Sequence, residues 1–146
     1  MISMNLLEHA VTYSVEQPGS GEVYDLLVRS GLFEGVTLTV GADEVGRAFA
    51  GSNLVVCARA HRSGQLLGVC RALTDFTRHC LVATVAVAPE AKGHGIGRGL
   101  IAATHEAAGG TEKIVLFLHS DPRACGFYEK LGFKRELDFF SLNNVS

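Results

Sequence analysis

The stretch APEAKGHGIGRGL, residues 88–100, decides the fold of this chain. It directly follows the apolar run CLVATVAV (80–87), which predicts a central strand covered on both faces. Beyond the glycines, apolar residues recur at helical spacing as far as residues 109 and 110, which predicts an amphipathic helix. Four alternate glycines therefore mark the point where a strand passes into a helix: Gly93, Gly95, Gly97 and Gly99.

Periodicity along the rest of the chain predicts an α/β fold with the element order β-α-α-β-β-β-α-β-α-β. Strands are expected over 10–15, 54–60, 65–75, 80–88, 113–120 and 133–142. Helices are expected from Ser20 to Gly31, over 41–52, from Ile96 to the glycines at 109 and 110, and over 123–131. Residues 54–75 read as a hairpin, whereas the later strand–helix–strand unit requires a parallel crossover, so the sheet should be mixed.

Length and composition exclude several classes of protein. A chain of 146 residues has the size of one domain, expected here over residues 1–146. Its 47% hydrophobic content and net charge of -2 are typical of a globular protein without a long nucleic-acid-binding face. No apolar stretch reaches the roughly 18 residues of a membrane span, and the N-terminus lacks the pattern of a signal peptide. A cytoplasmic protein is the resulting expectation.

The cysteines and histidines show no ligand or disulfide pattern. Cys57, Cys70, Cys80 and Cys125 form no CxxC pair, so reduced and mostly buried thiols are expected. The six histidines form no HExxH or comparable spacing. The sequence therefore predicts no metal site.

The glycine stretch is suited to binding phosphate. Glycines permit left-handed backbone angles and leave the N–H groups open to a ligand. Because a helix begins here, these donors coincide with the positive end of its dipole. Lys92 and Arg98 would add charge, while His94 is mostly neutral at pH 7. The alternative is a tight connection whose charged side chains are only solvated.

The exact residue pattern distinguishes between the known phosphate-binding motifs. A Walker A loop, GxxxxGK[ST], does not occur. A GxGxxG fingerprint is also absent, because Arg98 or Leu100 occupies the position of its last glycine. What remains is Lys92-Gly93-His94-Gly95-Ile96-Gly97, followed later by FYEKLGF (127–133). Together they resemble the GNAT superfamily of acyl-CoA-dependent N-acetyltransferases, with lysine in place of the usual arginine or glutamine. The order of elements is similar along nearly the whole chain, although the N-terminal third carries no motif.

This resemblance implies acetyl-CoA as co-substrate and a sheet that splays beside the central strand. The pantetheine arm would pair with the backbone of Val85, Ala86 and Val87, and the turn from Lys92 to Arg98 would hold the pyrophosphate. Tyr128 falls on the family's tyrosine that protonates the leaving sulfur; a pKa of about 10 keeps it protonated at pH 7. Packing is the other explanation for this ring. Asp121 occupies the place of an asparagine that bonds pantetheine, but an ionised carboxylate cannot donate.

The acceptor and the general base are less defined. Asp75 and His79 lie near the start of the central strand, where either could take the amine's proton; a role for Asp75 in a turn is the alternative. LLVRSGLF (26–33) and RALTD (71–75) are similar to a bacterial branch related to plastid amine acetyltransferases, which favours a small-molecule amine. The alternatives are a protein or peptide amine, or a non-catalytic acyl-CoA sensor. The surplus phenylalanines of the last strand add the expectation of a homodimer.

Overall fold

The computed structural model describes residues 10–34 and 40–143, and within them one mixed five-stranded sheet. The strands lie in the chain order β1 (Val11–Val15), β2 (Leu54–Ala60), β3 (Leu66–Thr74), β4 (His79–Val87) and β5 (Val115–Phe117). Neighbours from β1 to β4 pair antiparallel, whereas β5 runs parallel to β4. The predicted mixed sheet is confirmed.

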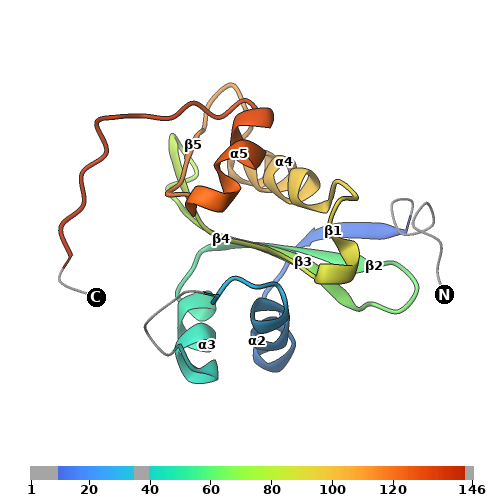
Figure 1. Ribbon diagram of the computed structural model, residues 1–146. Coiled ribbons are helices and arrows are strands. Elements are labelled where there is room, and N and C mark those ends of the chain that lie inside the picture. The colour runs from blue at the N-terminus through green and yellow to red at the C-terminus, as the bar shows by residue number, and fades with distance from the viewer. Residues whose placement is uncertain (1–9, 35–39, 144–146) are drawn as a thin grey trace.

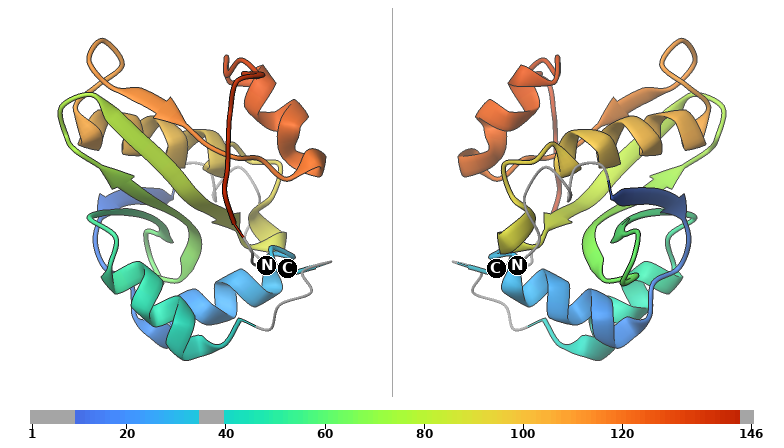
Figure 2. Two further views of the ribbon diagram at one scale, coloured as in Figure 1. Left: turned by 90° about the vertical axis from the view of Figure 1, so that its left-hand side faces the viewer. Right: turned by 90° about the vertical axis from the view of Figure 1, so that its right-hand side faces the viewer.

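Helices cover both faces of this sheet (Figures 1 and 2). On one face lie α2 (Ser20–Arg29) and α3 (Ala42–Ala50), and on the other lie α4 (Ile96–Ala108) and α5 (Cys125–Lys130). Two short 3₁₀ turns, η1 (Pro89–Ala91) and η2 (Pro122–Ala124), precede α4 and α5. The glycine turn thus follows β4 and leads into α4.

Local chemistry explains where the first helix begins and ends. The Glu22 carboxylate accepts a hydrogen bond of 2.9 Å from the Gly19 N–H just before α2. Val23, Leu26 and Leu27 are buried at helical spacing. Gly31, with φ of 86°, follows the last turn in the left-handed conformation. Helix α2 therefore ends where the sequence predicts.

The strand β4 has two irregularities that open the sheet. Arg71 of β3 pairs with Thr84 but Ala72 pairs with Val82, so Ala83 is an extra residue that forms a β-bulge. On the other side, β5 pairs only with residues 79–81 of β4. Within the described residues, the backbone of residues 82–87 that faces away from β3 therefore has no strand partner. This opening agrees with the splay that the resemblance implies.

Two strand predictions need correction. The predicted buried strand over 113–120 is reduced to three residues, and Val115 and Phe117 are exposed. The predicted strand over 133–142 is wrong, because the described part of this segment forms no strand. Phe139 instead stacks on His119 with ring centroids 5.6 Å apart, and Leu137, Phe140 and Leu142 are almost fully exposed. Strand-like alternation is present, but no neighbouring strand accepts the segment.

The described residues agree with the expectation for the cysteines. Cys57, Cys70 and Cys80 are buried, Cys125 is half-buried, and all four are free thiols. Among the helices of residues 10–34 and 40–143, none has the length and hydropathy to cross a membrane.

Candidate active site

A groove of about 580 Å³ lies at the open edge of β4. Its walls are the loop after α2, the second half of β4, the glycine turn, the start of α4, and the η2–α5 segment. Most sequence-predicted residues line it: Val85, Ala86, Val87, Lys92, Gly93, Gly95, Ile96, Gly97, Arg98, Asp121 and Tyr128. His94 and Asp75 are outside its lining. Residues far apart in the sequence thus meet in one depression.

The glycine turn presents a row of free backbone donors to this groove. Gly93 and Gly95 have φ of 82° and 79°, values that favour glycine. In the described chain, no hydrogen bond is donated by the N–H groups of residues 93–98. These amides coincide with the positive end of the α4 dipole. The turn can therefore bind an anion through its main chain.

The other two glycines of the stretch serve packing. A Cβ at Gly97 would lie 2.9 Å from Cζ of Phe127, so α5 rests directly on the first turn of α4. A Cβ at Gly99 would overlap the phenol of Tyr13 on β1. The four alternate glycines therefore have two different tasks, conformational at 93 and 95, and steric at 97 and 99.

Four cations surround the groove, of which the sequence indicated two. Lys92 and Arg98 come from the glycine turn, and Arg123 and Lys130 come from η2 and α5. Lys92 Nζ already donates a 2.8 Å hydrogen bond to the Ser30 carbonyl at the end of α2. Arg123 belongs to no motif and Lys130 lies in the FYEKLGF motif, but only the folded chain brings the two cations to the glycine turn.

Tyr128 is held in an aromatic cluster beside the groove. Its ring lies edge-on to Phe127 at 5.0 Å and to Phe133 at 5.6 Å between centroids. Burial, with a smaller contribution from Cys70, raises the pKa of the phenol above 10. Its hydroxyl bonds to no described residue. A protonated phenol with a free O–H therefore lines the groove.

The Asp121 carboxylate is already bonded by the neighbouring residue Arg123. Its carboxylate accepts a 2.8 Å bond from the Arg123 backbone N–H and contacts the Arg123 guanidinium at 3.1 and 3.0 Å. These bonds, led by the guanidinium, lower the pKa of Asp121. The side chain thus caps η2 and remains an ionised acceptor.

Asp75 and His79 lie at the other end of β4 from the groove. The Asp75 carboxylate accepts backbone hydrogen bonds from Arg78 at 2.7 Å, Thr77 at 2.9 Å and His79 at 3.0 Å. These donors lower its pKa from 3.8 to about 2. Residues 79 and 85 of a strand are separated by roughly 20 Å. The structure therefore places Asp75 in a turn, away from the groove.

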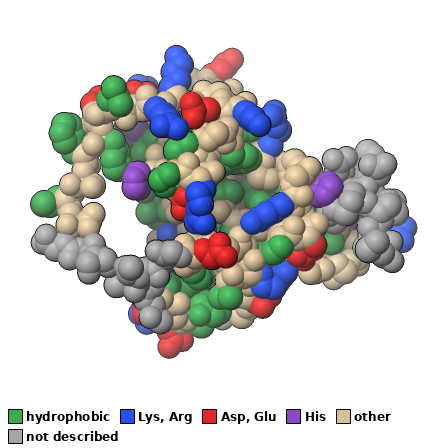
Figure 3. All heavy atoms as spheres, viewed as in Figure 1, with side chains coloured by type: hydrophobic (Ala, Val, Ile, Leu, Met, Phe, Trp, Pro, Cys, Tyr) green, Lys and Arg blue, Asp and Glu red, His purple; other side chains and the backbone are tan. Residues whose placement is uncertain are grey.

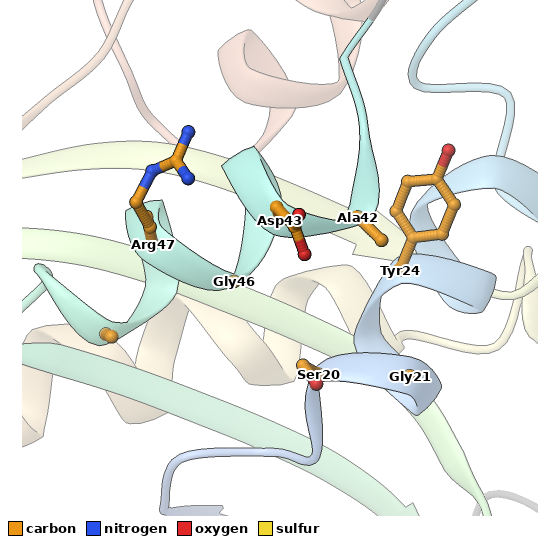
Figure 4. A pocket seen from close by; sticks show the side chains of 8 residues that line it. Ser20, Gly21, Tyr24, Ala42, Asp43, Gly46 and Arg47 are labelled. Carbon is orange, nitrogen blue, oxygen red and sulfur yellow. The ribbon is translucent and has the colours of Figure 1, made fainter.

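A second hollow, of about 530 Å³, lies between α2 and α3 (Figure 4). Ser20 and Tyr24 of α2 and Asp43 and Arg47 of α3 supply its polar side chains. It contains none of the sequence-predicted residues. Within residues 10–34 and 40–143, no three His, Cys, Asp or Glu side chains gather as metal ligands.

The chain is similar to known proteins in sequence and in structure. Residues 50–135 match the family model described as an acetyltransferase (GNAT) domain. No curated protein sequence matches the chain. Several solved structures share its fold, each at low sequence identity. A Deinococcus radiodurans R1 protein assigned as an acetyltransferase is 22% identical, with a TM-score of 0.72 over 94% of this chain and 90% of that chain.

Two further structures extend this comparison. A GNAT family protein from Streptococcus pneumoniae TIGR4 is 18% identical, with a TM-score of 0.65 over 92% of this chain and 99% of that one. An aminoglycoside acetyltransferase from an uncultured soil metagenomic sample, in complex with sisomicin, is 13% identical, with a TM-score of 0.68 over 95% and 99%. At such identities, these likenesses concern the fold alone.

Proposed function

The chain belongs to the GNAT acetyltransferase family, and from this premise we propose that it transfers the acetyl group of acetyl-CoA to a primary amine of a small molecule. The observation that carries the proposal is the groove in which free main-chain donors, an unpaired strand edge and a free phenol meet. Each of the three matches one requirement of the reaction: to hold the coenzyme, to aim its thioester and to protonate its sulfur.

Coenzyme A would bind along the open edge of β4. Its diphosphate is placed on the amides of residues 93–98, where the dipole of α4 and the Arg98 side chain favour negative charge. The pantetheine arm then runs along the backbone of residues 85–87, which pairs with no strand on that side. Main-chain pairing of this kind orients an extended ligand without a dedicated side chain. The Asp121 carboxylate is not required in this arrangement.

The chemical step is a direct attack. The neutral amine forms a bond to the thioester carbon, and the carbonyl oxygen becomes an oxyanion beside the strand. The carbon–sulfur bond then breaks, and Tyr128 donates its proton to the leaving sulfur. The nitrogen loses its proton to water, and solvent reprotonates the phenolate. No side chain of this chain is assigned as the base.

Two observations support a small-molecule amine as the acceptor. A neighbour of the same fold is an aminoglycoside acetyltransferase seen with sisomicin, which supports a small-molecule amine. The loop after α2 contributes Glu34 to the groove, an exposed carboxylate 3.6 Å from the Arg123 guanidinium that could also hold an ammonium before it loses its proton. A protein or peptide amine is the alternative within enzymes.

One observation favours a second function, that of an acyl-CoA sensor without turnover. Asp121 is engaged by Arg123, and the acidic candidate for the base, Asp75, is bonded in a distant turn. A sensor needs the coenzyme site alone. The amides of the glycine turn would serve it equally well.

Release of coenzyme A thiol, measured with acetyl-CoA and a panel of small amines and peptides, tests the proposal. Thiol release on small amines is the expected result. If no amine or peptide supports turnover while acetyl-CoA still raises the thermal midpoint, the sensor function replaces the enzyme. If acetyl-CoA neither reacts nor stabilises the fold, both functions fail.

A homodimer through the C-terminal segment, residues 134–143, is also proposed. Apolar side chains stand out from this segment (Figure 3), and Leu137, Phe140 and Leu142 are at least 90% exposed. The side of β5 away from β4 pairs with no described strand. A second copy would cover both surfaces at once, which supports the pairing of this segment with a partner.

A further inference from the structure

Arg71, in the middle of β3, is a half-buried cation that forms no ion pair with a described residue. Among the described arginines, Arg59 and Arg71 are half-buried, and the others are exposed. Arg59 lies against the carboxylates of Glu16 at 2.7 Å and Glu22 at 2.6 Å. Within the described residues, Arg71 forms no ion pair. Since a partly desolvated charge is costly without a counter-ion, this position requires an explanation.

Neutral groups fix the orientation of the Arg71 side chain. Its Nε donates to Thr84 Oγ1 at 3.2 Å, and its Nη1 donates to Ser52 Oγ at 3.1 Å. The guanidinium carbon lies 5.6 Å from the centre of the Phe49 ring. Burial lowers the pKa of Arg71, yet arginine remains charged at every physiological pH. The side chain is therefore a fixed positive charge.

One amino group of the Arg71 guanidinium has no partner within the described residues. Nη2 makes no hydrogen bond there, and the fully buried side-chain atom without a partner is Thr104 Oγ1 alone. Nη2 is therefore not fully buried. Together with the second hydrogen of Nη1, it forms the planar end of the guanidinium, which matches the two oxygens of a carboxylate or phosphate.

The position of this charge relates it to the groove. Thr84, which Arg71 contacts, directly precedes Val85 in the strand segment that lines the groove. Arg71 contacts Phe49 of α3, so it lies on the face covered by α2 and α3. The loop that follows α2 lines the groove from this same side. Arg71 itself does not line the groove, so an acceptor that approaches from this side would reach the guanidinium by extending its anionic end toward Thr84, one strand residue or about 3.3 Å from Val85.

We propose that Arg71 forms an anion subsite, which selects amine acceptors that also carry a carboxylate or phosphate group. This inference rests on the proposed function and specifies the class of its acceptor. Glu34, which lines the groove and lies 3.6 Å from the Arg123 guanidinium, would attract the ammonium end of the same molecule in competition with that arginine. An ω-amino acid or an aminoalkyl phosphate has the required pair of opposite charges.

The test compares matched acceptors on the full chain. The carboxylate pairs are the ω-amino acids from glycine to 6-aminohexanoate, each with its carboxamide, and the phosphate pair is phosphoethanolamine with ethanolamine. Wild-type protein should have a roughly ten- to hundredfold higher kcat/KM for the anionic member of at least one pair. The two kinds of pair separate carboxylate from phosphate recognition. Equal values within every pair overturn the subsite.

Variants locate the preference at Arg71. Arg71→Gln should abolish it through KM while leaving kcat near wild type, and Arg71→Lys should retain only part of it because lysine lacks the planar fork. Arg78→Gln is the matched control, since this arginine of the same hairpin is exposed and makes no ion pair within the described chain. A preference that survives in a folded Arg71→Gln protein also overturns the proposal.

A binding measurement separates this proposal from the enzymatic one. Titration calorimetry with each pair, on protein with and without coenzyme A, requires no turnover. Carboxylate or phosphate binding that is lost in Arg71→Gln, in a protein that acetylates nothing, would support the subsite and contradict the enzyme. Turnover without any preference for anions would support the enzyme and contradict the subsite. If Arg71→Gln does not fold, Arg71→Lys and the wild-type pairs still decide.

Discussion

The ring of Phe127 lies directly over Gly97, where an added Cβ would come within 2.9 Å of the ring's Cζ. This contact joins the helix that carries Tyr128 to the helix whose first turn presents the free amides. The missing side chain at Gly97 thus allows the two helices to approach each other this closely. The absent side chain has a structural role as well as leaving room for a ligand.

Replacing Gly97 with valine should therefore disturb coenzyme binding. The side chain must displace Phe127 and with it α5, so we expect the Kd for coenzyme A to rise at least about tenfold. Calorimetric titration measures this change. Gly126→Ala is the control, because a Cβ at Gly126 on α5 meets no atom within 4 Å. Equal affinities for wild type and Gly97→Val would contradict this packing role.

Gly95→Ala tests the conformational role of the turn. A φ of 79° is disfavoured for alanine by about 1–2 kcal/mol, so the free energy of unfolding should fall by about that amount. Coenzyme affinity should fall with it, since the strained turn no longer holds its amides in place. Denaturant titration gives the first quantity and calorimetry the second. Gly21→Ala, in open space on α2, should instead stabilise the protein by up to about 1 kcal/mol.

Tyr128→Phe should remove proton donation and leave the fold intact. We expect kcat for thiol release to fall by about 10²- to 10⁴-fold while coenzyme affinity stays near wild type. Tyr24→Phe provides the matched loss of a hydroxyl, one that donates to the Val40 carbonyl outside the groove. If Tyr128→Phe has the kcat of the wild type, Tyr128 does not donate the proton and its ring has a packing role only.

We expect Asp75 to contribute to the stability of the fold in a pH-dependent way, and not to catalysis. Three backbone donors lower its pKa from 3.8 to about 2, so the ionised carboxylate stabilises the turn above about pH 4. That contribution disappears as the pH falls through about 2. Asp75→Ala should thus lower the thermal midpoint at pH 7, and the two midpoints should converge as the pH falls from about 4 to 2. Asp138→Ala, in the exposed C-terminal segment, is the comparison variant, and kcat should be unaffected by either change.

Removal of the chain beyond Glu136 tests the proposed dimer. Because residues 137–143 join no strand, truncation should change the free energy of unfolding by less than about 1 kcal/mol. Light scattering should report a dimer for the full chain and a monomer for the shortened one. The same mass for both forms would place any dimer contact elsewhere.

The sequence predicts best what depends on local backbone chemistry. The glycine turn, the end of α2 at Gly31 and the strand-to-helix passage into α4 are confirmed, because each follows from residues close together in the chain. The motif also brought attention to Tyr128, which lines the groove. These features need no knowledge of distant partners.

Features that depend on distant partners could not be predicted. The alternation in residues 133–142 is compatible with a strand, but a strand also needs a neighbour, and this chain's β5 is only three residues long. Arg71 had one signal, a single charge within the apolar run LLGVCRALT (66–74). Its partners Phe49, Ser52 and Thr84 come from other parts of the chain, so the sequence alone could not show what this charge contacts.

The hydrogen bond from Lys92 to the carbonyl of Ser30 has a kinetic consequence. A diphosphate that recruits this ammonium must share it with, or take it from, the last turn of α2, and the following loop lines the groove where we propose the acceptor to enter. Arrival of the coenzyme would then reshape the entrance for the second substrate. We expect compulsory-order kinetics with the nucleotide first, and Lys92→Met should convert them to random order.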